Sequence, residues 1–174
     1  MPSTLIVLTA AAALATGSAL PVLAPAAVPG LAASTHAVSA HDLAADVDGG
    51  GRFEGLLRGW GFARGRERDF QGPSQKLDRV VSRTLAFGGP SGASAYVAWL
   101  GAHPAALYGA GSSTSRATSK GRVGVVIDAA PCACHRASPT LLGVVAHGGR
   151  VTWVEANGGA VTRSVLLRLL AQAP

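Results

Sequence analysis

The feature of the sequence that most restricts the fold is a β-hairpin in the last third of the chain. Residues 141–147 (LLGVVAH) and 150–156 (RVTWVEA) are rich in apolar and β-branched residues, and only Gly148 and Gly149 separate them. A two-residue glycine linker between such runs is typical of a tight hairpin turn. Because a hairpin pairs its two strands antiparallel, this segment favours an antiparallel sheet.

The spacing of apolar residues predicts the other elements of the domain. The expected helices are 41–47, 53–60, 92–102 and 161–172, and the further strands are 61–70, 77–87 and 122–128. Residues 109–121 are rich in Ser, Thr and Gly, and we expect them to form a loop. This order predicts an α+β fold with a single antiparallel sheet of about five strands and the helices packed on one face.

The N-terminal part of the chain differs in composition from the rest. All 15 Lys and Arg residues and all 9 Asp and Glu residues follow Ala40. Residues 4–15 form an apolar run that is too short to cross a bilayer as a helix of about 20 residues, which favours a secretory signal peptide. Small residues permit cleavage after Ala19 or after Ala26.

These features divide the chain into three parts. We predict a signal peptide over residues 1–26, a flexible spacer rich in Pro and Ala over 27–40, and a single α+β domain over 41–174. The protein is therefore expected to be secreted or extracytoplasmic. An alternative is that the apolar run stays uncleaved and retains the protein at the membrane. No Cys directly follows that run, which excludes lipid attachment at a lipobox.

The formal net charge of +6 is carried by the predicted domain. In an exported protein, this charge indicates affinity for an anionic envelope polymer, a lipid headgroup or another envelope protein, and makes nucleic acid an unlikely partner. An alternative explanation is codon usage in a GC-rich bacterial genome, because Arg outnumbers Lys by 13 to 2.

Arginine alternates with other residues along the predicted strand 61–70 (GFARGRERDF). Successive side chains of a strand point to opposite faces, so arginines two residues apart share a face. Together with the arginines of the next strand, they are expected to form one basic face that binds phosphate or carboxylate groups through guanidinium forks. The predicted ligand-binding residues are Arg64, Arg66, Arg68, Arg79 and Arg83.

The alternative for this segment is a solvated strand without a ligand. A bulge at Gly65 would turn Phe62 inward and leave the arginines in solvent, paired with Glu67 or Asp69.

The only two cysteines lie in the segment 131-PCACH-135. In an oxidising compartment, Cys132 and Cys134 are candidates for a local disulfide, provided that a turn after Pro131 brings them close enough. A metal site would need a further ligand from a remote histidine, because structural zinc usually has four ligands. We predict no metal site and no cofactor.

Motifs typical of enzymes are missing from the sequence. It contains no P-loop, no G-x-S-x-G and no H-E-x-x-H, and its carboxylates are scattered singly. We therefore predict an exported, non-catalytic binding or interaction module at the bacterial cell envelope, with an anionic ligand as one option. The alternative is a small hydrolase or redox enzyme that uses the segment Cys132-Ala133-Cys134-His135.

Three stretches of the chain resemble a known group of domains. The pattern of LLRGWGFARGRERDF, PSGASAYVAWL and LLGVVAHGGRVTWVEANGG, followed by a terminal amphipathic helix, is similar to secreted and lipid-anchored domains of unknown function in actinobacteria. The resemblance covers nearly the whole predicted domain. It implies a location outside the cytoplasm and an α+β fold, and it gives no indication of which activity the protein has.

Overall fold

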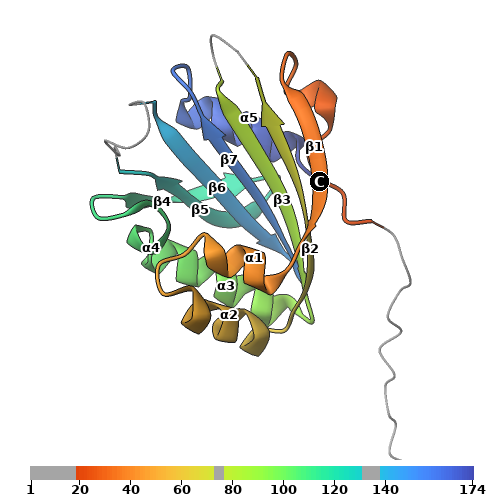
Figure 1. Ribbon diagram of the computed structural model, residues 1–174, viewed down its shortest axis with the longest axis vertical. Coiled ribbons are helices and arrows are strands. Elements are labelled where there is room, and N and C mark those ends of the chain that lie inside the picture. The colour runs from red at the N-terminus through yellow and green to blue at the C-terminus, as the bar shows by residue number, and fades with distance from the viewer. Residues whose placement is uncertain (1–18, 73–76, 131–137) are drawn as a thin grey trace, which may run out of the picture.

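The computed structural model describes residues 19–72, 77–130 and 138–174, which form one antiparallel sheet with helices on both sides (Figure 1). The sheet has seven strands in the order β1-β2-β3-β7-β6-β5-β4, and each neighbouring pair is antiparallel. The strands are β1 (Ala32–Val38), β2 (Phe62–Gln71), β3 (Arg79–Phe87), β4 (Ser113–Ser119), β5 (Arg122–Asp128), β6 (Thr140–His147) and β7 (Arg150–Asn157).

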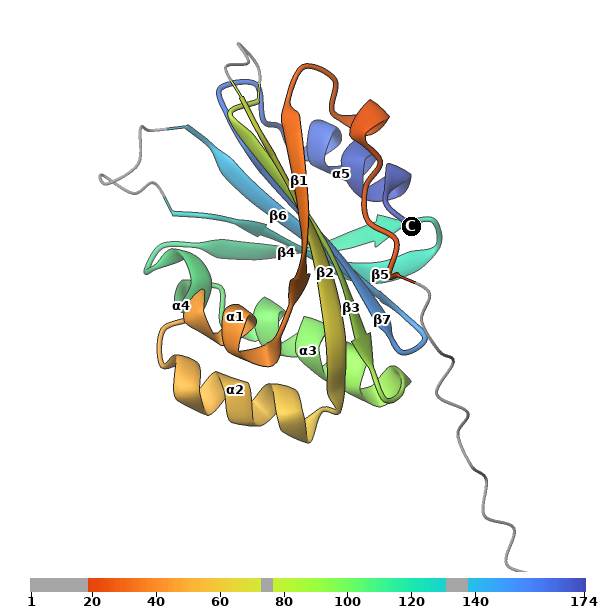
Figure 2. The same cartoon turned by 45° about the vertical axis from the view of Figure 1, so that its right-hand side comes forward.

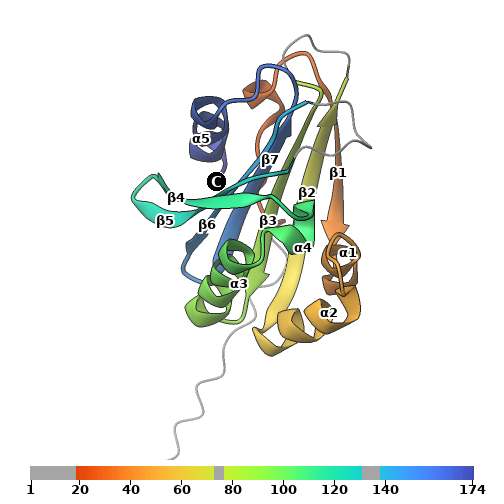
Figure 3. The ribbon, with the colours of Figure 1, turned by 90° about the vertical axis from the view of Figure 1, so that its left-hand side faces the viewer.

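Five α-helices accompany the sheet within the described residues. They are α1 (Ala40–Ala45), α2 (Gly50–Gly59), α3 (Pro90–Ala102), α4 (Ala105–Tyr108) and α5 (Arg163–Gln172), and a short 3-10 turn, η1, covers Pro25–Ala27. Figure 1 shows α1, α2, α3 and α4 in front of the lower half of the sheet, with α5 behind it. Figure 3 shows α5 and the α1–α2 pair on opposite sides of the sheet.

The predicted hairpin is confirmed. His147 of β6 pairs with Arg150 of β7, and Gly148 adopts a φ of 56°, the region that glycine enters without strain. Gly149 lies against the neighbouring strand, where its carbonyl accepts a hydrogen bond of 2.8 Å from the amide of Phe87. A Cβ atom at residue 149 would lie 2.9 Å from the Phe87 carbonyl oxygen, so the close approach of the two backbones requires glycine.

The α+β class is correct, but the prediction of helices on one face is wrong. The central strands contain adjacent apolar residues that are both buried, such as Val80 with Val81 and Val144 with Val145. Because neighbouring side chains point to opposite faces, such pairs make both faces of the sheet apolar. Helices α1, α2 and α3 cover one face, hereafter the α1–α3 side, and α5 covers the other, hereafter the α5 side.

The prediction of about five strands is also wrong, because the two edge strands β1 and β4 have no apolar pattern. Six of the seven residues of β1 are exposed, and in β4 only Ala117 and Ser119 are buried. Strand β1 lies within the predicted spacer 27–40, and β4 lies within the predicted loop 109–121. Both segments are held by backbone pairing to their neighbours, which leaves little trace in the side chains.

Residues 19–28, hereafter the N-terminal segment, pack on the α5 side of the sheet. Leu20, Leu23 and Val28 are buried, and the amide of Leu23 donates a 3.1 Å hydrogen bond to the Ser82 hydroxyl of β3. Figure 2 shows this segment running past the end of α5 near the C-terminus. The folded part of the chain therefore starts before the predicted domain boundary at residue 41. The rest of the predicted signal peptide, residues 1–18, lies outside the described residues.

Candidate functional site

The arginines that the sequence assigned to one basic face lie on both faces of the sheet. In the β2–β3 register, Arg66 is opposite Thr84 and Arg68 is opposite Ser82, whereas Arg83 is opposite Glu67. Directly opposite residues share a face, so the strand alternation separates the arginines of β2 from those of β3. Arg64, Arg66 and Arg68 lie on the α5 side, and Arg79 and Arg83 lie on the α1–α3 side.

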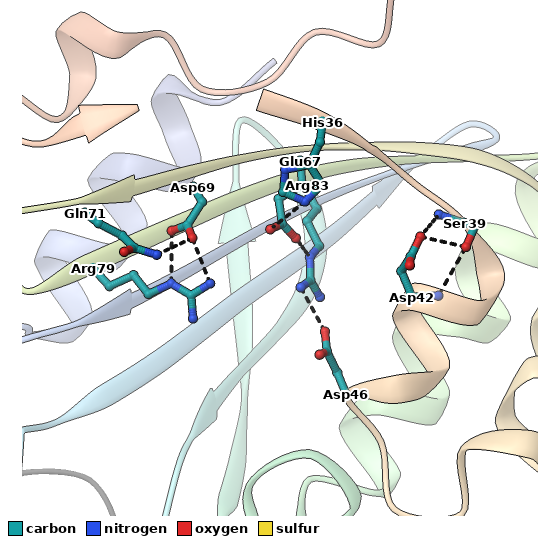
Figure 4. A network of polar contacts seen from close by, with 9 residues as sticks. All are labelled: His36, Ser39, Asp42, Asp46, Glu67, Asp69, Gln71, Arg79 and Arg83. Atoms are coloured by element: carbon teal, nitrogen blue, oxygen red, sulfur yellow. Dashed lines mark hydrogen bonds and ion pairs between the residues drawn. The ribbon is translucent and has the colours of Figure 1, made fainter. Parts of the chain in front are cut away.

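Arg83 belongs to a buried charged cluster on the α1–α3 side (Figure 4). Its guanidinium forms ion pairs with Glu67 of β2 and, at 2.8 Å, with Asp46 beside α1, and it lies 3.9 Å from the centre of the Trp153 ring. The side chains of Arg83 and Glu67 are only 13% and 7% exposed. Burial alone lowers the pKa of Arg83, but the two carboxylates outweigh that effect and raise the pKa above its ordinary value.

This cluster joins α1 to the sheet and gives Arg83 a structural role. His36 of β1 extends it, because its Nε2 lies 3.3 Å from Oε1 of Glu67. The sequence offered neither His36 nor Asp46 as part of a cluster with Arg83, since His36 lies in the predicted spacer.

Arg79 is held by Asp69 of the adjacent strand (Figure 4). Its Nε and Nη2 atoms donate to the two carboxylate oxygens of Asp69, each at 2.9 Å, and the Gln71 amide donates to the same carboxylate at 2.6 Å. This two-point contact occupies one edge of the Arg79 guanidinium. The alternative interpretation of the sequence paired arginines with Glu67 or Asp69. This pairing is found for Arg83 and Arg79, the two arginines of β3.

Replacing Arg79 by alanine should raise the pKa of the Asp69 carboxyl. Burial alone raises this pKa, but the hydrogen bonds from Arg79 and Gln71 outweigh it and hold the pKa below its usual value. Asp69 therefore stabilises the fold at pH values above the ordinary aspartate pKa. This contribution is lost as the pH falls through the lower pKa that Asp69 has in the folded protein. The variant should be less stable than the wild type at neutral pH, with a difference that shrinks in acid.

NMR titration of the Asp69 carboxyl carbon measures the pKa directly, and thermal unfolding at several pH values measures the stability. An Asp69 pKa that is the same in both proteins would show that Arg79 does not control it.

Two arginines of β2 hold the N-terminal segment. Arg66 Nη1 donates to the carbonyl of Leu20 at 3.3 Å, and Arg68 Nη1 donates to the carbonyl of Leu23 at 2.8 Å. Arg68 also donates to Thr35 Oγ1 of β1 at 2.8 Å. Arg64, near the start of the strand, is exposed. Arg66 and Arg68 therefore make structural contacts, and Arg64 is exposed on the α5 side.

A shallow pocket of about 90 Å³ lies on the α5 side, beside the turn between β6 and β7. Of the residues that line it, Arg122, His147 and Arg150 are half-buried or exposed and are called its rim, and Thr84 and Thr152 are buried and are called its floor. The N-terminal segment and the end of the chain wall it through Pro21 and Pro174, whose backbone oxygens accept hydrogen bonds from Thr84 and Thr152.

Sequence reasoning missed this group, although one part of it was accessible. The predicted hairpin places His147 directly opposite Arg150 once its two-residue turn is accepted. The contribution of Arg122 depends on the pairing of β5 with β6, which no short turn dictates. We call Arg64, Arg66, Arg122, His147 and Arg150 the basic rim.

Acidic side chains are separated from the basic rim. Four lie in or beside α1 and α2, and three of the sheet residues point to the α1–α3 side. The last two are Asp78, just before β3, and Asp128, the last residue of β5, and both lie at the ends of these strands that are away from the β6–β7 turn. Asp128 is opposite Leu141 and points to the α5 side. The complete set is Asp42, Asp46, Asp48, Glu54, Glu67, Asp69, Asp78, Asp128 and Glu155. Asp128 therefore shares the face of the basic rim, but it lies at the far end of β5 from Arg122, and no Asp or Glu side chain lies next to the basic rim.

The predicted disulfide and the alternative enzymatic segment, Cys132 to His135, lie outside the described residues and stay predictions. Within the part of the chain that the structure describes, no three His, Cys, Asp or Glu side chains gather as a metal site requires. Among the same residues, no helix is both long enough and apolar enough to cross a membrane.

Comparison with known proteins gives little further information. No protein-family model matches the sequence, and no curated protein matches it. The chain is similar in structure to the extracellular domain of PknH from Mycobacterium tuberculosis, with 14% sequence identity and a TM-score of 0.42, over 82% of this chain and 79% of that one. Similarity at this level does not identify a shared function.

Proposed function

We propose that this protein is exported and acts as a non-catalytic binding module for an anionic ligand at the bacterial cell envelope. The apolar run of residues 4–15 and the uncharged residues that follow it support export. The observation that carries the binding function is the separation of charge, with the basic rim on one face and the acidic side chains on the other face or at the far end of the strands.

Charges of one sign that share a surface add their potentials, whereas paired charges largely cancel. Arg79 and Arg83 are paired with carboxylates and contribute little to such a surface. Among the described residues, no Asp or Glu side chain forms an ion pair with Arg122 or Arg150, and Arg150 is exposed. The proposed anion-binding face therefore consists of the arginines of β2 together with Arg122 and Arg150. The two arginines of β3 are not part of it.

The register of the sheet gives the basic rim a regular spacing. Arg64 lies opposite Ala86 of β3, and Ala86 lies opposite Arg150 of β7, so one row crosses three strands. With neighbouring strands about 4.8 Å apart, the backbones at Arg64 and Arg150 are roughly 10 Å apart. Such a row meets several negative groups of a polymer or a lipid surface at once, which favours an extended anionic ligand.

The proposed function predicts that the protein sediments with vesicles containing phosphatidylglycerol and not with vesicles of phosphatidylcholine alone. Added salt should weaken the association, because the Debye length falls from about 10 Å at 0.1 M to about 3 Å at 1 M. The double variant Arg64→Gln/Arg150→Gln should lose most of the association.

Net charge alone also attracts a basic protein to such vesicles, so a control with the same charge is needed. Arg52→Gln/Arg116→Gln removes one exposed arginine from α2 and one from the side of β4 that faces away from the α5 side. The wild type and both double variants have the same N-terminus, so its apolar residues cannot cause a difference in vesicle association between them. Equal loss in both double variants, or no association of the wild type, would rule out the basic rim as a binding face.

A further inference from the structure

We propose that the pocket between Arg122, His147 and Arg150 binds a single phosphate group, presented as free phosphate or on a phospholipid headgroup. This inference rests on the proposed function and assigns a chemical group to the centre of the basic rim.

The three rim side chains come from three adjacent strands, β5, β6 and β7, and meet at one pocket. Arg150 and His147 are exposed, and Arg122 is half-buried with one contact of 3.4 Å to the Pro174 oxygen. Arg122 therefore keeps further N–H groups for a ligand, and Arg150 keeps its whole guanidinium fork within the described structure. Guanidinium groups bind the oxygens of phosphate in pairs, and a histidine ring nitrogen adds a donor from another direction.

The number of converging donors distinguishes phosphate from carboxylate. One guanidinium fork satisfies the two oxygens of a carboxylate, so a carboxylate would engage only part of the donors that line the pocket. A phosphate group carries more oxygens at tetrahedral angles, so it can accept from all three side chains. Asp128 shares this face but lies at the far end of β5, and Asp78 precedes β3 at the end away from the β6–β7 turn, so neither side chain competes for those donors. The acceptor already in the pocket is the Pro174 oxygen, which takes one contact from Arg122 and one from Thr152.

The floor of the pocket is already built without a ligand. Thr152 Oγ1 donates to the Pro174 oxygen at 2.8 Å, and Thr84 Oγ1 donates to the carbonyl of Pro21. These contacts fix the pocket walls and satisfy the threonine hydroxyls. Because these contacts order the floor before a ligand binds, less binding free energy is spent on ordering the protein. The volume of about 90 Å³ suits one compact group and excludes larger ones from the floor.

Titration of the purified protein with inorganic phosphate, at an ionic strength held constant with chloride, tests the site. NMR signals of the His147 ring and of the arginine Nε–H groups should shift in a saturable way, centred on Arg122, His147 and Arg150. Arg150→Gln should weaken binding by about tenfold or more, because hydrogen bonds to charged groups are among the stronger ones. Arg150→Lys keeps the charge without the fork and should bind more weakly than the wild type.

Arg116→Gln is the matched control, since it removes one exposed arginine from the other side of the sheet and should leave phosphate binding unchanged. The unfolding midpoint of each variant establishes that it is folded. Shifts that do not saturate, or an equal loss of binding in Arg116→Gln, would overturn the pocket assignment.

Vesicle experiments separate this inference from the proposed function and distinguish the two phosphate sources. Inorganic phosphate that displaces the protein from phosphatidylglycerol vesicles identifies the headgroup as the source, and phosphate that binds without displacement identifies free phosphate. Vesicle association without phosphate binding would reject the pocket and leave the proposed function intact. Phosphate binding without vesicle or polymer association would keep the pocket and reject the extended anionic ligand.

Discussion

Replacing Leu23 by alanine should lower the free energy of unfolding by about 2–5 kcal/mol, the cost usual for a fully buried leucine. Leu23 is 0% exposed and packs in the core on the α5 side together with residues of β3, β7 and α5. Its backbone is also bound at both polar atoms, by the Ser82 hydroxyl and by the Arg68 guanidinium. Denaturant unfolding measures the loss, with Val123→Ala as a control at a side chain that is 51% exposed. A change below about 1 kcal/mol would show that the N-terminal segment contributes little to the fold.

This packing has a direct bearing on signal cleavage. Cleavage after Ala26 would remove both Leu20 and Leu23 from the core, whereas cleavage after Ala19 would keep them. We therefore expect the intact mass of the exported protein to correspond to a chain that begins at Leu20. An exported and stable protein beginning at Ala27 would contradict this expectation.

Replacing Arg83 by methionine should cost about 3–5 kcal/mol, the range typical when one partner of a buried ion pair is removed. Glu67, with a side chain 7% exposed, would then lose its main partner. Loss of the contact with the Trp153 ring adds to the effect. Chemical denaturation at neutral pH measures the difference from the wild type.

A double-mutant cycle tests whether the cost comes from the unpaired carboxylate. Arg83→Met combined with Glu67→Leu removes both charges and should recover much of the lost stability. Asp46→Asn serves as the control, because its side chain is 46% exposed and an exposed pair contributes at most about 1 kcal/mol. A double variant that is less stable than Arg83→Met alone would contradict the explanation.

Much of the sheet was predictable because β3, β5, β6 and β7 carry long apolar or β-branched runs. Strand β5 has the predicted bounds, the β6–β7 hairpin has the predicted turn, and α5 occupies most of the predicted helix. The edge strands β1 and β4 escaped prediction because solvent covers most of their side chains, so their sequences resemble those of linkers.

The candidate site was predictable only within single strands. Alternation along β2 correctly places Arg64, Arg66 and Arg68 together, and alternation along β3 places Arg79 with Arg83. Whether the two sets share a face depends on the register, and a shift of one residue reverses the answer. Here Arg83 is opposite Glu67, so the register brings opposite charges together. The Arg122 contribution was out of reach for the same reason, since it depends on pairing between strands without a short connection.

The central pairing of the sheet affects how soon the molecule can fold. Strand β3 pairs with β7, although α3, α4 and three strands separate them in the sequence. The N-terminal segment and α5 complete the same core from opposite ends of the chain. Contacts between residues so distant in sequence slow folding, because the chain must close long loops before it gains those contacts. A chain of this topology cannot complete its core until nearly all of it has been synthesised, a delay that would suit the export proposed above.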